Sequence, residues 1–199
     1  MLRERVFLSA ALTAVLTATG AAQSQQAAID RLQLGERLTR TLQGAATDRM
    51  AVPLAAGQFV RVEVMQIGTD VGVVFRDPGN RIVTQVDSVN GRYGPETVVA
   101  IVESAGDYLL EVSLASGASG KGTYEVTLAE AREATAADRE FVTAHRLVRQ
   151  ALEIFRKHTA EGRKDALELL GRSRDIFAKL GDRYQQALTL AFKIGRAHV

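Results

Sequence analysis

The chain has no cysteine and no tryptophan, and only three histidines, among its 199 residues. The absence of cysteine excludes disulfides, thiolate nucleophiles and thiolate metal sites. The chain also has no large excess of one charge, because it contains 25 Lys and Arg and 23 Asp and Glu. A balance this close to neutral supplies no broad phosphate-binding field, so nucleic acid is not the expected partner. The 46% of hydrophobic and 24% of charged residues that remain are typical of a globular chain with one or two modest domains.

The first 22 residues have the order of an export signal. Arg3 and Arg5 precede an apolar run from Val6 to Val15, and small residues follow up to Ala22. This order predicts a secretory signal peptide over residues 1–22 and a periplasmic or extracellular location. The alternative is an uncleaved amphipathic helix, which the lack of a polar face within the run disfavours. The run is shorter than the roughly 20 apolar residues of a spanning helix, so we expect no membrane span after cleavage.

From residue 35 to 130 the apolar residues recur with a period of two, and Gly, Asn, Asp and Pro interrupt the pattern. Period two is typical of strands with one buried face, and the interrupting residues favour turns. Eight short strands without a helical pattern between them predict an antiparallel β-sandwich of the jelly-roll kind. The predicted strands are Arg37–Leu42, Arg49–Leu54, Phe59–Gln66, Val71–Arg76, Ile82–Val86, Thr97–Glu103, Tyr108–Leu114 and Thr123–Ala129.

After Glu130 the apolar residues recur at helical spacing. Thr135 and Asp138 fit a capping box at the start of a first helix, and a break is expected at Glu161–Gly162. A second helix is predicted to end at Gly181, where Asp182 caps a third. The predicted fold class is therefore α+β in two parts, a sandwich over 35–130 and a helical hairpin with the start of another over 135–193.

The balance of charge differs between the predicted sandwich and the predicted helices. Residues 23–130 carry nine basic and thirteen acidic side chains, and residues 131–199 carry fourteen and nine. The basic helices favour an acidic partner or a membrane surface. A solvated helix face is the simpler interpretation, because acidic residues are interleaved throughout.

Two segments of the sandwich resemble a known family. Ala105–Val112 with Gly122–Leu128 resembles the paired closing strands of the bacterial pre-peptidase C-terminal (PPC) domain, a small jelly-roll sandwich attached to secreted enzymes. Asp70–Asn80, followed by Asp87–Gly91, is similar to its central hairpin.

The helical part resembles another family. Asp165–Leu190, with the sequence FAKLGDR at its joint, is similar to the tetratricopeptide repeats of bacterial proteins that end in a CHAT domain, a caspase-like peptidase relative. The His/Cys pair of caspase-like chemistry has no place here, since the chain has no cysteine. The resemblance therefore implies the accessory region of a secreted protein, and any proteolytic role would belong to other sequence.

The last six residues, Ile194–Val199, match one reading frame of a sequencing-library adapter. Helical-repeat arrays normally need about three repeats and a cap, and this chain holds little more than one. We therefore interpret residues 194–199 as adapter-derived and expect the repeat array to continue beyond them.

Catalytic motifs are weak in this sequence. Gly117–Gly122 lacks the first glycine and the Ser or Thr of a phosphate loop, and is better interpreted as a turn. His145 and His158 both fall in the predicted first helix, too far apart to share a metal.

Acidic and amide residues at predicted strand ends are the remaining candidates for a metal site. Oxygen ligands suit Ca²⁺, but the spacing does not match an EF-hand loop, and such side chains also cap turns. We favour turn capping over calcium binding for the whole set, which comprises Asp70, Asp77, Asn80, Asp87, Asn90 and Glu96.

The sequence thus predicts no catalytic, cofactor-binding or metal-binding residue, and no cofactor. It favours a non-catalytic exported fragment that binds a protein or peptide through its helices. The alternatives are the accessory region of a CHAT-type peptidase and, less favoured, a carbohydrate-binding module. Oligomeric state is not predicted.

Overall fold

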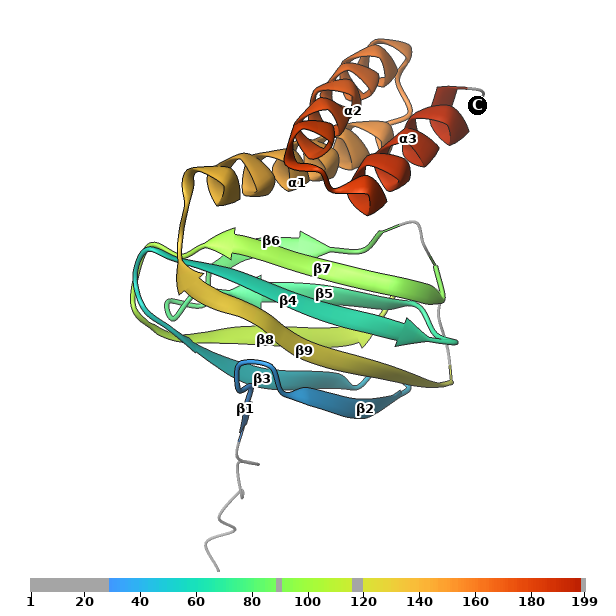
Figure 1. The fold of residues 1–199 in the computed structure, drawn as a ribbon. Coiled ribbons are helices and arrows are strands. Elements are labelled where there is room, and N and C mark those ends of the chain that lie inside the picture. The colour runs from blue at the N-terminus through green and yellow to red at the C-terminus, as the bar shows by residue number, and fades with distance from the viewer. Residues whose placement is uncertain (1–28, 89–90, 116–119, 198–199) are drawn as a thin grey trace, which may run out of the picture.

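Two β-sheets and a layer of helices make up the computed structural model, which describes residues 29–88, 91–115 and 120–197 (Figure 1). One sheet has the order β1-β3-β8-β5-β6 and the other the order β2-β9-β4-β7. Apart from β1, which runs parallel to β3, these neighbours are antiparallel. The strands are β1 Asp30–Arg31, β2 Arg37–Gln43, β3 Thr47–Leu54, β4 Gln58–Ile67, β5 Val71–Arg76, β6 Ile82–Val86, β7 Tyr93–Ile101, β8 Gly106–Leu114 and β9 Lys121–Glu133.

The strand order is that of a jelly roll. The pairs β2/β9 and β4/β7 lie in one sheet, and the pairs β3/β8 and β5/β6 lie in the other. Alternate residues of each strand face the space between the sheets, which is the apolar core. Tyr108 and Phe75 stack there with ring centroids 5.3 Å apart. Tyr124 is also fully buried, and its hydroxyl donates to Asp48 Oδ2 at 2.8 Å.

Three helices follow the sandwich: α1 Ala136–Phe155, α2 Ala160–Leu180 and α3 Arg183–Ala197. α1 and α2 form an antiparallel hairpin, and α3 packs beside α2 (Figure 1). Ser173 is fully buried between α2 and α1, where its hydroxyl donates to the carbonyl oxygen of Ala144 at 2.9 Å. Gly181 ends α2 with φ 75°, a left-handed conformation that glycine adopts without steric cost. No described helix is long and apolar enough to cross a membrane.

The predicted strands and helices are confirmed with several corrections. The pattern missed β1, whose two residues are too few to show a period. It placed the seventh strand at Thr97–Glu103, whereas β7 begins at Tyr93 and ends at Ile101. The helix break lies before Ala160, so Glu161 and Gly162 belong to the first turn of α2, and Gly162 N–H donates to the Thr159 cap. Assignment of the helices to tetratricopeptide repeats stays a prediction, and the proposed signal peptide lies outside the described residues.

Candidate binding groove between the sandwich and the helices

The junction between sandwich and helices is short and held by side chains. β9 ends at Glu133 and α1 begins at Ala136, with Thr135 and Asp138 forming the predicted capping box. The Arg132 guanidinium donates to both carboxylate oxygens of Asp138, at 2.6 and 2.9 Å, and holds the pKa of that carboxyl well below its usual range. The orientation of α1 is therefore fixed from its first turn.

An aromatic cluster joins the two parts beside this junction. Phe59 of β4 meets Phe141 of α1 at 6.4 Å between centroids, and Phe141 meets Phe177 of α2 at 5.7 Å. His145 lies 4.7 Å from Phe141 and 5.1 Å from Phe177. All four contacts are edge-to-face, an arrangement favourable for aromatic rings.

Burial in this cluster, and to a smaller extent the nearby charges of Arg61 and Arg149, lowers the pKa of His145 to about 4. The ring is therefore neutral near pH 7. Its Nε2 atom is buried and has no hydrogen-bond partner among the described residues.

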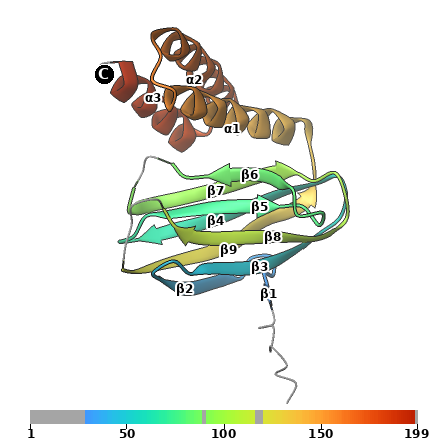
Figure 2. The same ribbon diagram turned by 180° about the vertical axis from the view of Figure 1, so that it is seen from behind.

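Next to the cluster a cavity of about 410 Å³ lies between the sandwich edge and the helices. We call it the junction groove. One wall is made by α1 and α3, and the opposite wall by β6 and β7, the strands that lie nearest the helical layer (Figures 1 and 2). Its apolar lining is Val83, Val86, Pro95, Val99, Ala100, Ile101, Val142, Val148, Leu152, Leu188 and Phe192. A concave site of this size, lined by apolar and polar side chains in similar proportion, falls in the size range of ligand pockets.

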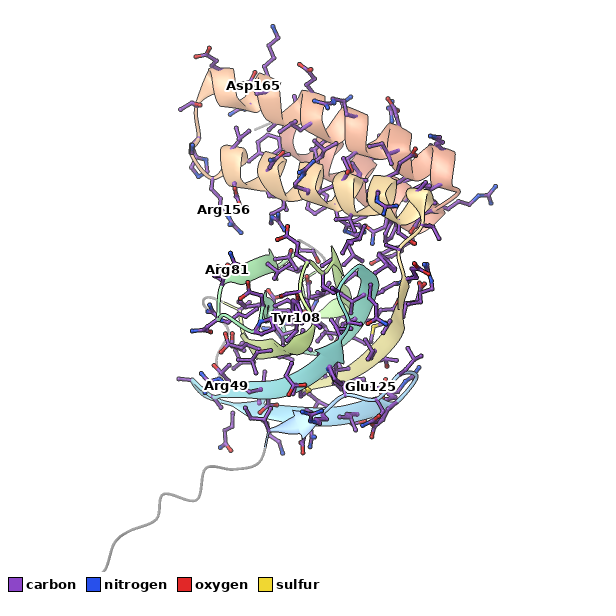
Figure 3. The ribbon with its side chains drawn as sticks, turned by 90° about the vertical axis from the view of Figure 1, so that its left-hand side faces the viewer. Arg49, Arg81, Tyr108, Glu125, Arg156 and Asp165 are labelled. Carbon is purple, nitrogen blue, oxygen red and sulfur yellow. The ribbon has the colours of Figure 1, made fainter. Side chains whose placement is uncertain are left out.

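Three arginines line the junction groove, namely Arg146 and Arg149 of α1 and Arg156, the residue that caps its C-terminus. Arg149 Nη1 donates to Thr84 Oγ1 of β6 and so spans the groove. In Figure 3, Arg156 lies between the helical layer and the sandwich. No ion pair within the described part of the chain joins any of the three to a carboxylate. The acidic residues of the lining are Asp87, Glu103 and Glu153.

A buried carboxylate lies below the sandwich wall of the groove. Glu96 of β7 is fully buried and accepts from Ser88 N–H at 2.9 Å and from the Ser88 hydroxyl at 2.6 Å. It also accepts from Gln66 Nε2 at 3.1 Å, and Gln66 Oε1 in turn accepts from Val71 N–H at 2.7 Å. This network fixes the β4–β5 turn and the segment after β6 to the core side of β7.

Burial raises the pKa of Glu96, hydrogen bonds from Ser88 oppose this rise, and the charges of Asp87 and Asp70 add to it, so that the pKa is about 7. Burial and Asp87 also raise the pKa of Asp70, whose Oδ1 has no partner among the described residues.

Of the six residues weighed for calcium, Asp70, Asp87 and Glu96 lie near enough for their charges to interact. Asp77 and Asn80 lie apart from them in the β5–β6 turn, where Asp77 Oδ1 accepts from Arg81 N–H at 2.8 Å. Asn90 lies outside the described residues. Within the part that is described, no three acidic or histidine side chains are placed to hold a metal ion.

The other singled-out residues are dispersed. His158 is not in the first helix as predicted: it follows the end of α1, exposed and with φ 53°. Of Gly117–Gly122, residues 117–119 lie outside the described part, and Lys121 and Gly122 begin β9.

The sequence offered a signal for Glu96 but none for the groove. Glu96 lies in the same inward row of β7 as Val98 and Ala100, so a strand drawn from Tyr93 would have placed it inside the core. The contact between Arg149 and Thr84 joins residues 65 positions apart and leaves no periodic trace in the sequence.

Comparison with known proteins found no matching family model and no matching curated protein. Among solved structures, the pre-peptidase C-terminal domain of a Bacillus anthracis collagenase is 21% identical, with a TM-score of 0.40, covering 50% of this chain and 92% of that domain. A periplasmic inhibitor of g-type lysozyme from Aeromonas hydrophila is 14% identical, with a TM-score of 0.42, covering 49% and 91%. A family 6 carbohydrate-binding module is 8% identical, with a TM-score of 0.29, covering 51% and 98%.

Proposed function

We propose that this chain is a non-catalytic binding module of an exported protein, and that the junction groove holds an extended peptide segment of a partner. The observation that carries the proposal is the cavity of about 410 Å³, whose sandwich wall combines apolar side chains such as Val99 and Ile101 with polar ones and whose helical wall carries arginines. Apolar lining supplies affinity and a few polar groups supply orientation in such sites.

The junction supports this function because it keeps the groove open in one shape. The Arg132–Asp138 pair and the aromatic contacts of Phe59 and Phe141 hold α1 over the sandwich edge. A preformed site loses less conformational entropy when it binds a ligand.

The proposal is tested by selecting extended peptides from a display library on the full chain. Gln185 lines the groove from α3, whereas its neighbour Gln186 lies outside the lining. We expect the selected peptides to lose binding to Gln185→Trp, whose indole enters the groove, and to keep binding to the matched control Gln186→Trp. A library that yields no binder, or binders that ignore the Trp at 185, would refute the groove as the site.

Carbohydrate binding is the second candidate, favoured by one exposed aromatic residue. Tyr93 is 69% exposed and pairs across the sheet with Ile67, which is 44% exposed. Aromatic faces of this kind serve as stacking platforms in binding sites. Glycan-array binding that disappears in Tyr93→Ala would support this candidate, and a silent array would remove it.

A further inference from the structure

We infer that the segment bound in the junction groove is an extended strand with carboxylates on alternate residues, which pairs with the free edge of β6 and meets the arginines of α1. The inference rests on the proposed function and specifies its ligand. It depends on three observations: the direction of the β6 backbone groups, the lining of the groove, and the arginines of the helical wall, none of which forms an ion pair with a carboxylate of the described residues, although Arg149 donates to Thr84 Oγ1.

The backbone groups of β6 that point away from the sheet can be located by alternation. Ala115 N–H donates to Asp70 O at 3.0 Å, so the backbone groups of Asp70 point toward β8. Those of Val73, three residues later, point to the other side, toward its partner Val86. The N–H and C=O of Gln85, next to Val86, therefore point away from β5. Among the described strands β6 is the last of its sheet, so these groups lie at an edge that no described strand covers.

The lining of the groove shows that this edge faces it. Side chains of consecutive strand residues point to opposite faces of a sheet. A cavity beside one face would therefore be lined by every second residue, whereas the junction groove is lined by all six residues from Val83 to Ser88. The edge of β6 itself bounds the cavity, and an exposed strand edge is the template for adding another strand.

The helical wall supplies charge complementarity. It carries Arg146, Arg149 and Arg156 against one acid, Glu153. Ten residues of helix separate the first and last arginine, about 15 Å at 1.5 Å per residue. Four residues of strand span about 13 Å, so the first and last of three acidic side chains at every second position lie about as far apart as Arg146 and Arg156. The buried Nε2 of His145, which lacks a partner among the described residues, lies on the same wall.

The apolar side chains of the sandwich wall account for the residues between the carboxylates. If the carboxylates of the bound strand face the arginines, the side chains between them point to the opposite side, toward the sandwich. Val99 and Ile101 line that side from β7. The bound segment is therefore one in which acidic and β-branched apolar residues alternate.

The test uses a fluorescein-labelled seven-residue peptide, Thr-Glu-Val-Glu-Val-Glu-Thr, titrated with the full chain and followed by fluorescence anisotropy. Control peptides are the same sequence with Gln for Glu, and the acidic sequence N-methylated at alternate backbone nitrogens so that it cannot pair with a strand edge. We expect the acidic peptide to bind at least about tenfold more tightly than either control.

Chain variants locate the site. Arg149→Gln and Arg156→Gln should each weaken the acidic peptide about tenfold. Arg172→Gln serves as the matched control, because Arg172 is exposed on α2 and does not line the groove. Circular dichroism at 222 nm verifies that every variant is folded.

Equal binding of the acidic and Gln peptides would overturn the charge part of the inference, and unchanged binding of the N-methylated peptide would overturn strand pairing. If library-selected peptides of other chemistry bind the groove while the acidic peptide does not, the inference fails and the proposed function stands. If no peptide binds, both fail. Concentration-dependent dimers that the acidic peptide does not dissociate would instead identify a second copy of this chain as the occupant of the β6 edge.

Discussion

The contributions of Glu96 and His145 to the stability of this protein should nearly cancel between about pH 4.5 and 6.5, because the two buried groups respond to pH in opposite directions. Burial raises the pKa of Glu96 from 4.5 to about 7. A carboxyl group with a raised folded-state pKa contributes stability that is present below its unfolded pKa and is lost as the pH rises through its folded pKa. At about 1.4 kcal/mol for each pKa unit, the loss between pH 4.5 and 7 is about 3 kcal/mol.

His145 acts in the opposite direction. Burial lowers its pKa from 6.5 to about 4, so the folded protein holds the ring neutral where the unfolded chain would protonate it. Stability from this group is present above pH 6.5 and is lost as the pH falls toward 4, again by about 3 kcal/mol. Over the shared pH range the two slopes nearly cancel.

Replacing either Glu96 or His145 should leave the pH dependence of stability that the other group causes. Glu96→Gln should become more stable relative to the unsubstituted chain by about 3 kcal/mol as the pH rises from 4.5 to 8. His145→Phe, which keeps an aromatic ring against Phe141 and Phe177, should become more stable relative to that chain by about 3 kcal/mol as the pH falls from 6.5 to 4.

The assay is urea unfolding at half-unit pH intervals, followed by circular dichroism for the helices and by tyrosine fluorescence for the sandwich, since the chain has no tryptophan. Reading each variant as a difference from the unsubstituted chain at the same pH cancels the contributions of all other carboxylates. The reasoning is refuted if the Glu96→Gln difference does not change with pH, or changes with the opposite sign.

Two further pairs of substitutions, each with its own control, test the packing of the sandwich. Leu110→Asp places an unpaired charge in the fully buried core and should abolish cooperative unfolding, whereas Arg37→Ala, on an exposed side chain, should change the midpoint little; thermal melts distinguish the two. Gly122→Ala should cost about 1–3 kcal/mol, because its methyl group would collide with the side chain of Thr69, while Gly72→Ala meets open space and should cost under about 1 kcal/mol in urea titrations.

Local patterns predict those elements whose boundaries are determined by local chemistry. The bounds of β5 and β6 agree with the prediction to the residue, because the Asp77–Asn80 turn fixes both ends that meet there. The capping box of α1 is likewise local, since both of its residues lie within one turn.

Elements whose boundaries depend on distant residues were predicted less well. The predicted strand begins at Thr97 and not at Tyr93, because Pro95 and the charged Glu96 are residue types that argue against a strand interior. Glu96 is tolerated inside only because Ser88 and Gln66, which come from other segments, bond to it.

The junction groove depends on such long-range contacts throughout, because it joins residues 83–103 to residues 142–192. Its shape is set by the angle at which α1 leaves β9, and that angle depends on Arg132, which binds Asp138 and lies 5.0 Å above the ring of Phe59. A pattern that identifies α1 as a helix carries no information about this angle.

The same arrangement resolves two difficulties that each part would meet alone. A sandwich exposes edge strands, and edges left open promote aggregation. A helical hairpin with one further helix leaves an apolar face uncovered. Here α1 and α3 lie over the edges of β6 and β7, and those strands cover the helices in return (Figure 2). Because each surface is only partly filled by the other, the space between them is a cavity bounded by an unpaired strand edge and an apolar helix face, and these are the two surfaces that an extended peptide would bury.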